Sequence, residues 1–216
     1  MNLPETLRQL VDPGVVAVIR ADSSDQLLDC AKALADGGLR AMEVTMTTPN
    51  ALAVVRDVVE LMSDRVLMGV GTVLDPETAR AAILAGARFV VTPVMRPEII
   101  ACCRRYSIPI ICGAYTPTEA LAAHDAGADF IKIFPADTLG PGYMKALKAP
   151  LPQLRLIPTG GVDLDTAADF IKAGCDAVAA GGSLVSKEIL KSGDWETLTA
   201  RARRFVDVVA AARSTC

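Results

Sequence analysis

One segment sets the pattern for the whole chain: Ala126-Gly127-Ala128-Asp129-Phe130-Ile131-Lys132-Ile133-Phe134. Its glycine ends an Ala-rich amphipathic stretch, and the apolar run that follows is typical of a buried strand. The same order recurs along the chain at intervals of roughly 20–26 residues, which predicts repeated β–α units. The eight apolar runs are Val15–Arg20, Ala41–Thr45, Val66–Gly69, Phe89–Thr92, Pro109–Cys112, Phe130–Phe134, Arg155–Pro158 and Ala177–Ala180.

These units predict a (β/α)₈ TIM barrel, an α/β fold in which parallel strands form a ring inside a ring of helices. We expect a single domain over residues 1–216, with an extra N-terminal helix, Leu3–Val11, closing one end of the barrel. A doubly wound open sheet is the alternative, and the pattern alone leaves it open. No dinucleotide-binding glycine motif follows the first run, and Gly69-Val70-Gly71-Thr72 after the third is interpreted as a tight turn.

Composition argues against several classes of function. The net charge is −3 and no Lys/Arg run occurs, so we expect no nucleic-acid partner. We expect no membrane partner either, because no apolar stretch is long enough to span a bilayer and Met1–Leu7 lacks the features of a signal peptide. The cysteines form no CxxC pair, which predicts reduced thiols and a cytoplasmic location. They are Cys30, Cys102, Cys103, Cys112, Cys175 and Cys216.

Two charged side chains are predicted to point into the barrel. Alternate side chains of a barrel strand face the interior. Lys132 shares its face with Phe130 and Phe134, and Glu43 faces inward when its apolar neighbours on the second run face the helices. We therefore expect a lysine and an acid near the C-terminal mouth, where barrel enzymes have their active sites.

This pair suits catalysis by an amine. Burial disfavours the ammonium form and lowers the pKa of a lysine, and a neutral amine attacks a ketone to form an iminium. Glu43 would then transfer protons at the neighbouring carbon and on water. A structural ion pair between Lys132 and Glu43 is the alternative that these residue types leave open.

Glycine pairs follow the last two runs. Thr159-Gly160-Gly161-Val162 comes after the seventh, and Gly181-Gly182-Ser183 comes after the eighth. Glycines let backbone N–H groups approach an anion, and barrels often bind phosphate at these two loops. Helix ends and tight turns also use glycine, but paired glycines in both loops favour phosphate binding. A metal site of several histidines is excluded, because His124 is the only histidine.

Six short motifs occur in a fixed order over nearly the whole chain. They are Glu43-Val44-Thr45, Gly69-Val70-Gly71-Thr72-Val73, Val91-Thr92-Pro93, Lys132-Ile133-Phe134-Pro135-Ala136, Pro158-Thr159-Gly160-Gly161-Val162 and Gly181-Gly182-Ser183. Each motif alone is weak evidence. The ordered set resembles the 2-keto-3-deoxy-6-phosphogluconate (KDPG) / 4-hydroxy-2-oxoglutarate (KHG) aldolases, a family that includes the related phosphogalactonate enzymes.

The resemblance implies a class I aldolase that needs no metal and no cofactor and assembles as a homotrimer. It matches Lys132 to the Schiff-base lysine, Glu43 to the general acid and base, and Thr72 to a contact with the pyruvate carboxylate. The remaining matched positions are Pro93 and Phe134 around the keto acid, and Gly160, Gly161, Gly182 and Ser183 at the phosphate.

The carboxylate-binding arginine departs from part of the family. Some members carry it two residues after the threonine of the Glu-Val-Thr motif, a position that Thr47 occupies here. Other members end the first strand with arginine, as this chain does with Arg20. We therefore place Arg20 and Thr47 among the substrate-binding residues and assign the carboxylate to Arg20. Pairing of Arg20 with Glu43, or capping of the strand end, is the alternative.

The expected reaction cleaves KDPG, a keto-acid phosphate, to pyruvate and glyceraldehyde 3-phosphate, with KHG as a second substrate that yields glyoxylate. The phosphogalactonate epimer of KDPG is the near alternative as substrate. A phosphate-binding barrel isomerase or epimerase would use paired carboxylates or a metal instead. A non-catalytic sugar-phosphate-binding protein would require Lys132 and Glu43 to be too far apart to share a ligand.

Overall fold

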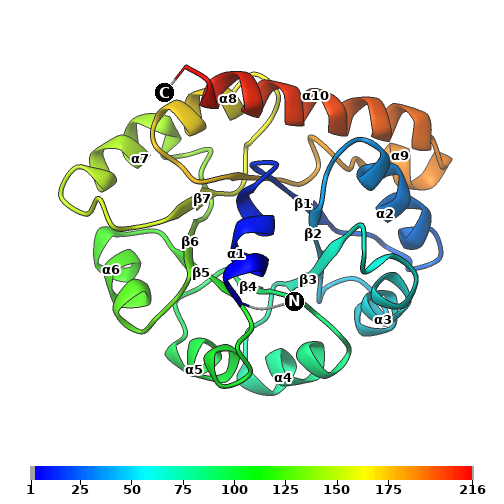
Figure 1. Cartoon of the computed structure of the whole chain (residues 1–216), viewed down its shortest axis with the longest axis horizontal. Helices are drawn as coiled ribbons and strands as arrows, with labels where there is room; N and C mark the ends of the chain where they lie inside the picture. The colour runs from blue at the N-terminus through cyan, green and yellow to red at the C-terminus, as the bar shows by residue number, and fades with distance from the viewer. Residues whose placement is uncertain (1–2, 216) are drawn as a thin grey trace.

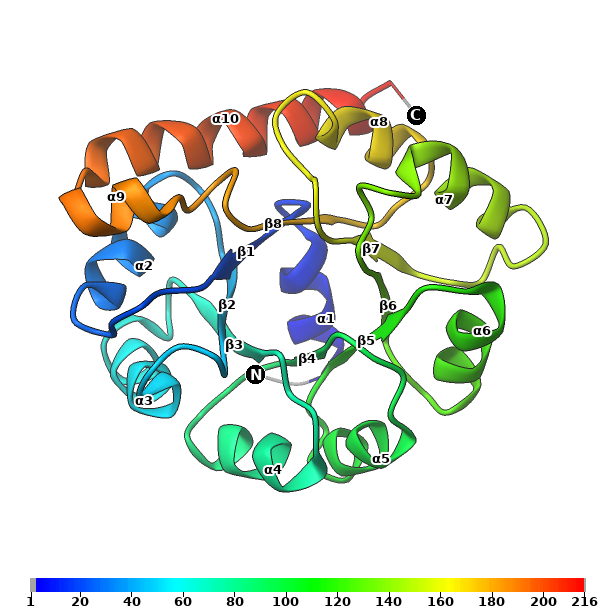
Figure 2. The ribbon, with the colours of Figure 1, turned by 180° about the vertical axis from the view of Figure 1, so that it is seen from behind.

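The computed structural model describes residues 3–215 and arranges parallel strands in a ring (Figures 1 and 2). The strands are β1 (Val15–Ile19), β2 (Ala41–Thr45), β3 (Leu67–Gly71), β4 (Val90–Thr92), β5 (Ile110–Ala114), β6 (Phe130–Ile133), β7 (Leu156–Pro158) and β8 (Val178–Ala180). They pair in the order β7-β6-β5-β4-β3-β2-β1-β8, and a bridge between Thr159 and Ala179 joins the two ends. This closure confirms the (β/α)₈ barrel and excludes the doubly wound open sheet.

Helices surround the strands. They are α1 (Leu3–Val11), α2 (Leu27–Asp36), α3 (Ala51–Met62), α4 (Pro76–Leu84), α5 (Pro97–Arg105), α6 (Pro117–Asp125), α7 (Gly140–Lys148), α8 (Ala167–Lys172), α9 (Lys187–Ser192) and α10 (Trp195–Arg213). Side-chain caps start several of them: Asp75 accepts from the backbone N–H of Thr78 at α4, and Thr116 and Glu119 form a capping box at α6. These caps fix the residue at which each helix begins, and therefore the residue at which the preceding loop ends.

Two strands extend beyond the apolar runs that predict them. β3 continues to Gly71, which pairs with Thr45 of β2, and β5 continues to Ala114, which pairs with Ile133 of β6. Both extensions contain a glycine, which adds no apolar side chain. A prediction from the hydrophobic pattern therefore ended these strands too early. The added residues extend the backbone pairing of both strands toward the C-terminal mouth of the barrel.

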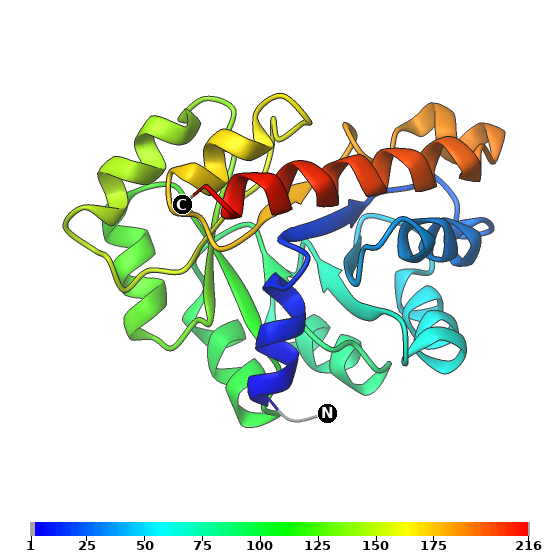
Figure 3. The same ribbon diagram turned by 45° about the horizontal axis from the view of Figure 1, so that its top comes forward.

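The side chains of the strands divide between two layers. Ala41 and Phe130 belong to the interior layer, whereas Met42 and Ile131 pack between strands and helices. Helix α1 crosses one end of the barrel, as predicted, and its Leu10 packs into the interior layer (Figures 1 and 3). The functional side chains are therefore left for the opposite end, where the strands finish.

The final helix, α10, packs against helices from both ends of the chain. α10 runs along α8 and α2 (Figure 1). Arg213, at its last turn, donates to the carbonyl oxygens of Val11 and Asp12 at 2.7 and 2.8 Å, which holds the segment that follows α1. Over residues 3–215, no helix has both the length and the apolar character needed to cross a bilayer.

Candidate active site

Lys132 of β6 lies in the barrel interior, as the alternation predicts. Its side chain is 6% exposed, and its Nζ lies 4.9 Å from the centre of the Phe134 ring. On the neighbouring strand its pairing partner is Gly113, where an added Cβ would lie 2.1 Å from the carbonyl carbon of Pro93. The glycine lets the Pro93 backbone pack directly beside the lysine's strand, so the structure brings Lys132, Phe134 and Pro93 to one end of the barrel.

Glu43 of β2 also lies in the interior and is 2% exposed. Among the described residues, its Oε1 has no hydrogen-bond partner. Gly71 of β3 leaves room for the carboxylate, since a Cβ there would lie 2.5 Å from Oε1. A buried polar atom without a partner costs about 1–3 kcal/mol, which makes this oxygen a candidate contact for a ligand.

Burial shifts both groups toward their neutral forms. It raises the pKa of Glu43, against the opposing effect of the positive charges of Lys132 and Arg20. It lowers the pKa of Lys132, which the Glu43 charge raises and the Arg20 charge lowers further. In the part of the chain that the structure describes, no ion pair joins Lys132 to Glu43. The structural ion pair is therefore not formed.

A cavity of about 420 Å³ opens at the C-terminal mouth, within the size range of small-molecule sites. It is lined by Phe134 and Thr159 and by the predicted phosphate loops, Gly160, Gly161, Gly182 and Ser183. Among residues 3–215, no protein acceptor takes the backbone N–H of Gly161, Gly182 or Ser183. The Ser183 hydroxyl donates to the carbonyl oxygen of Val162 at 2.5 Å and links the two loops. Backbone N–H groups without a protein acceptor, in loops that line one cavity, suit an anion.

A comparison with models of protein families gives a match to this chain. A family model described as KDPG and KHG aldolase matches residues 7–201. The chain belongs to the KDPG and KHG aldolase family. Its match covers most of the chain, from α1 into α10, and it agrees with the family that the ordered motifs predict.

Curated relatives of this family match over most of their length. The 2-dehydro-3-deoxy-phosphogluconate aldolase of Treponema pallidum (strain Nichols) is 36% identical over 90% of this chain and 93% of its own length. The 2-dehydro-3-deoxy-6-phosphogalactonate aldolase of Escherichia coli (strain K12) is also 36% identical, over 79% of this chain and 83% of its own length. Sequence identity therefore does not separate the two epimeric activities.

Solved structures agree with this placement. KDPG aldolase from Legionella pneumophila, with pyruvate captured as a covalent carbinolamine intermediate, superposes with a TM-score of 0.82 at 28% identity, covering 92% of this chain and 96% of that one. A cube-shaped cage designed by fusing symmetric oligomeric domains superposes with a TM-score of 0.87 at 32% identity, covering 94% of this chain and 74% of that one.

Arg20 and Thr47, the two predicted carboxylate ligands, lie in different places. Arg20 follows β1 and lines the cavity, and its charge acts on both Glu43 and Lys132. Within the described residues it forms no ion pair with Glu43. Thr47 is exposed, and its hydroxyl lies 2.8 Å from that of Thr45. It lines a separate surface depression, so of these two predicted ligands only Arg20 lines the cavity.

Thr72 follows β3 with a φ of +59°. A β-branched residue rarely adopts this left-handed conformation, and backbone strain of this kind is concentrated at functional sites. Thr72 is half-buried directly after Gly71, the residue that accommodates Glu43. The strain supports the prediction that Thr72 contacts the substrate.

Thr159 is the residue to which the motifs assigned no role of its own. Its Oγ1 is buried and, like Glu43 Oε1, has no partner among the described residues. It lines the same cavity as Phe134 and Gly160. The alternation that places Ile157 in the interior layer also places Thr159 there, so the rule applied to Lys132 would have found it.

The described cysteines and His124 do not line the substrate cavity. The described cysteines are buried and unpaired, and burial raises the pKa of Cys30, Cys103 and Cys175 to about 12. Cys216 lies outside the described residues, as do Met1 and Asn2. His124 lies in the last turn of α6. Over residues 3–215, no three His, Cys, Asp or Glu side chains gather as a set of metal ligands.

Proposed function

We propose that this chain is a class I aldolase that cleaves KDPG to pyruvate and glyceraldehyde 3-phosphate through a Schiff base on Lys132, with KHG as a second substrate. The observation that carries the proposal is the arrangement of Lys132 and Glu43, which share the barrel interior, influence each other's charge and form no ion pair. The covalent carbinolamine in the Legionella relative supports the same chemistry.

The first half of the reaction forms the electron sink. The neutral amine of Lys132 attacks the C2 carbonyl of the substrate and gives a carbinolamine. Burial raises the pKa of Glu43 and so favours its protonated form, which donates its proton to the departing C2 hydroxyl. Water leaves, a protonated imine remains on Lys132, and Glu43 becomes a carboxylate.

The second half breaks the carbon–carbon bond. Glu43 accepts the proton of the C4 hydroxyl, the C3–C4 bond breaks, and its electron pair moves into the imine to form an enamine. The C4 fragment leaves as the aldehyde. Glu43 then returns its proton to C3 of the enamine, which gives a protonated imine. Water adds to this imine and releases pyruvate and the neutral amine of Lys132, and the proton set free returns to the Glu43 carboxylate.

The substrate is oriented across the mouth from carboxylate to phosphate. We assign the carboxylate to Arg20 and Thr72, with Arg20 supplying the positive charge, and leave out Thr47, which lines a separate depression. Pro93 and Phe134 pack against the keto acid. The phosphate is bound by the N–H groups of the loops after β7 and β8, at Gly160, Gly161, Gly182 and Ser183.

Reductive trapping tests the proposal. Borohydride added with pyruvate reduces an imine to a stable amine, so peptide mass spectrometry should find the adduct on Lys132. Lys132→Met should lose the adduct, whereas Lys145→Met, in α7, should keep it. Absence of an adduct on wild-type Lys132, or its formation on another lysine, would overturn the assignment. An isomerase, an epimerase or a binding protein would give no adduct.

A second candidate substrate is the phosphogalactonate epimer. The Escherichia coli enzyme named for that substrate is 36% identical to this chain, the same percentage as the phosphogluconate enzyme of Treponema pallidum. Initial cleavage rates with the two epimers, measured at equal concentration, distinguish them. A higher kcat/KM for the galactonate compound would replace KDPG as the assigned substrate.

We also propose a homotrimeric assembly in the cytoplasm. Leu61, Leu74 and Leu84 are each more than half exposed, and such apolar side chains suit burial between subunits. The designed cage, built from symmetric oligomeric domains, supports assembly. Unpaired buried cysteines support a reducing compartment. Light scattering on the purified protein measures the mass, and a monomer would contradict the trimer.

A further inference from the structure

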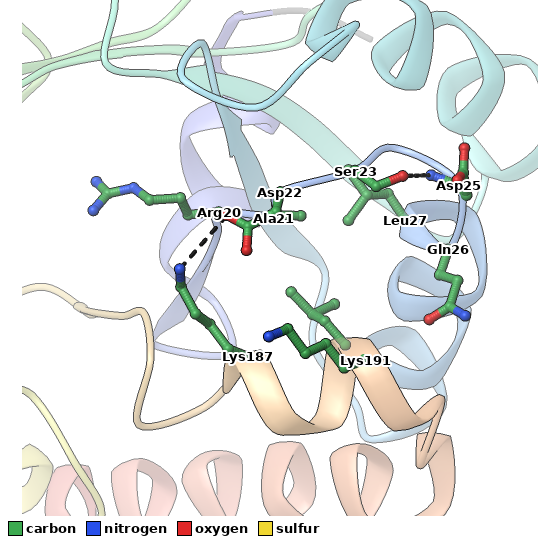
Figure 4. Close-up of a pocket in the computed structure, with 10 residues that line it drawn as sticks. Arg20, Ala21, Asp22, Ser23, Asp25, Gln26, Leu27, Lys187 and Lys191 are labelled. Atoms are coloured by element: carbon green, nitrogen blue, oxygen red, sulfur yellow. Dashed lines mark hydrogen bonds and ion pairs between the residues drawn. The ribbon is translucent and has the colours of Figure 1, made fainter.

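A second cavity adjoins the substrate cavity. It measures about 220 Å³ and lies between the loop after β1 and helix α9 (Figure 4). Arg20 and Lys187 line both cavities, whereas Lys191 lines only the second. Lys187 is the first residue of α9, so the loop that carries Gly182 and Ser183 leads into it. A cation therefore stands at the boundary between the two spaces.

The present partner of Lys187 is Asp22. Nζ and Oδ1 are 3.5 Å apart, and the two side chains are 67% and 73% exposed. Figure 4 shows the Lys187 amine directed across the cavity toward the loop that carries Asp22. A long and solvent-exposed ion pair contributes little stability. The amine can therefore change partners at small cost.

Lys187 is a cation on the lining of the substrate cavity, close in the chain to the second phosphate loop. Backbone N–H groups donate hydrogen bonds but carry no net charge. The charged residues that line the substrate cavity are Arg20, Asp163 and Lys187. Asp163 is an anion that accepts from the backbone N–H and hydroxyl of Thr166. Arg20 extends away from the second cavity in Figure 4, and its charge acts on Glu43 and Lys132.

We propose that Lys187 is a specificity residue for phosphorylated substrates: its amine leaves Asp22 and binds the phosphate held by the loops after β7 and β8. The proposal rests on the proposed function, since it deepens the phosphate end of that site. Asp22 holds the amine near the cavity until the substrate enters, and a dianionic phosphate competes better for the amine than one exposed carboxylate does.

Two substrates that differ only in the phosphate test this role. For Lys187→Met, the KM for KDPG should rise about ten-fold, as expected for the loss of one charge-assisted hydrogen bond. The kcat, and the kcat/KM for unphosphorylated 2-keto-3-deoxygluconate, should stay within about two-fold. Lys191→Met is the matched control on the same helix and should leave both substrates unchanged. Asp22→Asn should lower the KM for KDPG, and only when Lys187 is present.

A binding measurement separates this inference from the proposed function. Inorganic phosphate, titrated into each variant by calorimetry, should bind about ten-fold more weakly to Lys187→Met than to wild type or Lys191→Met. Equal phosphate affinity in wild type and Lys187→Met would overturn the role of Lys187, whatever the cleavage rates. A loss of phosphate affinity in a protein that gives no borohydride adduct would uphold Lys187 and overturn the aldolase. An equal loss of activity on both substrates would also count against the specificity role.

Discussion

Gly71 of β3 stands so close to Glu43 of β2 that a Cβ added to it would lie 2.5 Å from the carboxylate Oε1 and 2.7 Å from the carboxyl carbon. One side-chain position on β3 is therefore left empty for the acid of the neighbouring strand. The acid in turn has a buried oxygen without a partner among the described residues. Gly71 therefore provides the space that the Glu43 carboxylate occupies, and the unpartnered oxygen stays available to a substrate.

Gly71→Ala should displace the carboxylate without unfolding the barrel. The atoms in the way are the end of a flexible side chain, so we expect the free energy of unfolding to fall by less than about 1 kcal/mol. A misplaced proton donor should lower kcat by about ten-fold or more. Urea unfolding and steady-state cleavage measure the two effects. Gly142→Ala in α7, where an added Cβ meets no atom within 4 Å, should keep kcat. Full activity in Gly71→Ala would show that Glu43 needs no fixed position.

Glu43→Gln should gain stability relative to wild type as pH rises. Burial raises the pKa of Glu43 above its ordinary value of 4.5. Between those two pKa values the folded protein keeps a proton that the unfolded chain has released, so the free energy of unfolding of the wild type falls as pH increases. Glutamine does not titrate, so this decrease in the free energy of unfolding is absent from the Glu43→Gln variant.

Urea unfolding between about pH 5 and about pH 8 measures the difference, at about 1.4 kcal/mol per unit of pKa shift. A difference between Glu43→Gln and wild type that shrinks as pH rises would contradict the raised pKa of Glu43.

Thr159→Val should impair catalysis more than stability. The hydroxyl has no partner among the described residues, so its removal should leave the free energy of unfolding unchanged or raise it by up to about 1 kcal/mol. If that hydroxyl binds a hydroxyl of the substrate, kcat/KM should fall about ten-fold while trapping of pyruvate on Lys132 is retained.

Thr92→Val is the contrasting control for Thr159. The Thr92 hydroxyl donates to the carbonyl oxygen of Val94 at 3.1 Å, so its loss should destabilise the protein by about 1–2 kcal/mol. If Thr159→Val destabilises the protein equally and leaves kcat/KM unchanged, the Thr159 hydroxyl is structural.

Thr72→Gly should relieve backbone strain and weaken pyruvate binding. The φ of +59° is unfavourable for threonine, and its relief, less the entropy that glycine adds to the unfolded chain, should stabilise the protein by up to about 1 kcal/mol. The loss of the side chain should raise the pyruvate concentration needed for half-maximal trapping several-fold. Ser107→Gly, at a φ of +56° before β5, should stabilise the protein without affecting trapping. Unchanged trapping in Thr72→Gly would remove Thr72 from the site.

Much of this architecture was predictable because strands repeat every two residues. Lys132 and Glu43 could be placed in the interior from their neighbours alone, since apolar side chains on alternate positions must face the helix layer. The ends of β3 and β5 could not be placed in this way. Gly71 and Gly113 pair with neighbouring strands through their backbones, and a glycine adds no side chain to a hydrophobic pattern. Thr159 could have been found by the same rule of alternation.

The sequence by itself determined which segments become strands, where the glycine loops fall and which two ionisable side chains face inward, because these follow from local periodicity. Only the tertiary structure decided that Glu43 Oε1 and Thr159 Oγ1 lack partners, that burial drives Lys132 and Glu43 toward neutrality, and that Lys187 meets Asp22 beside the cavity. Partners and desolvation depend on atoms brought together from distant parts of the chain, and no local pattern encodes them.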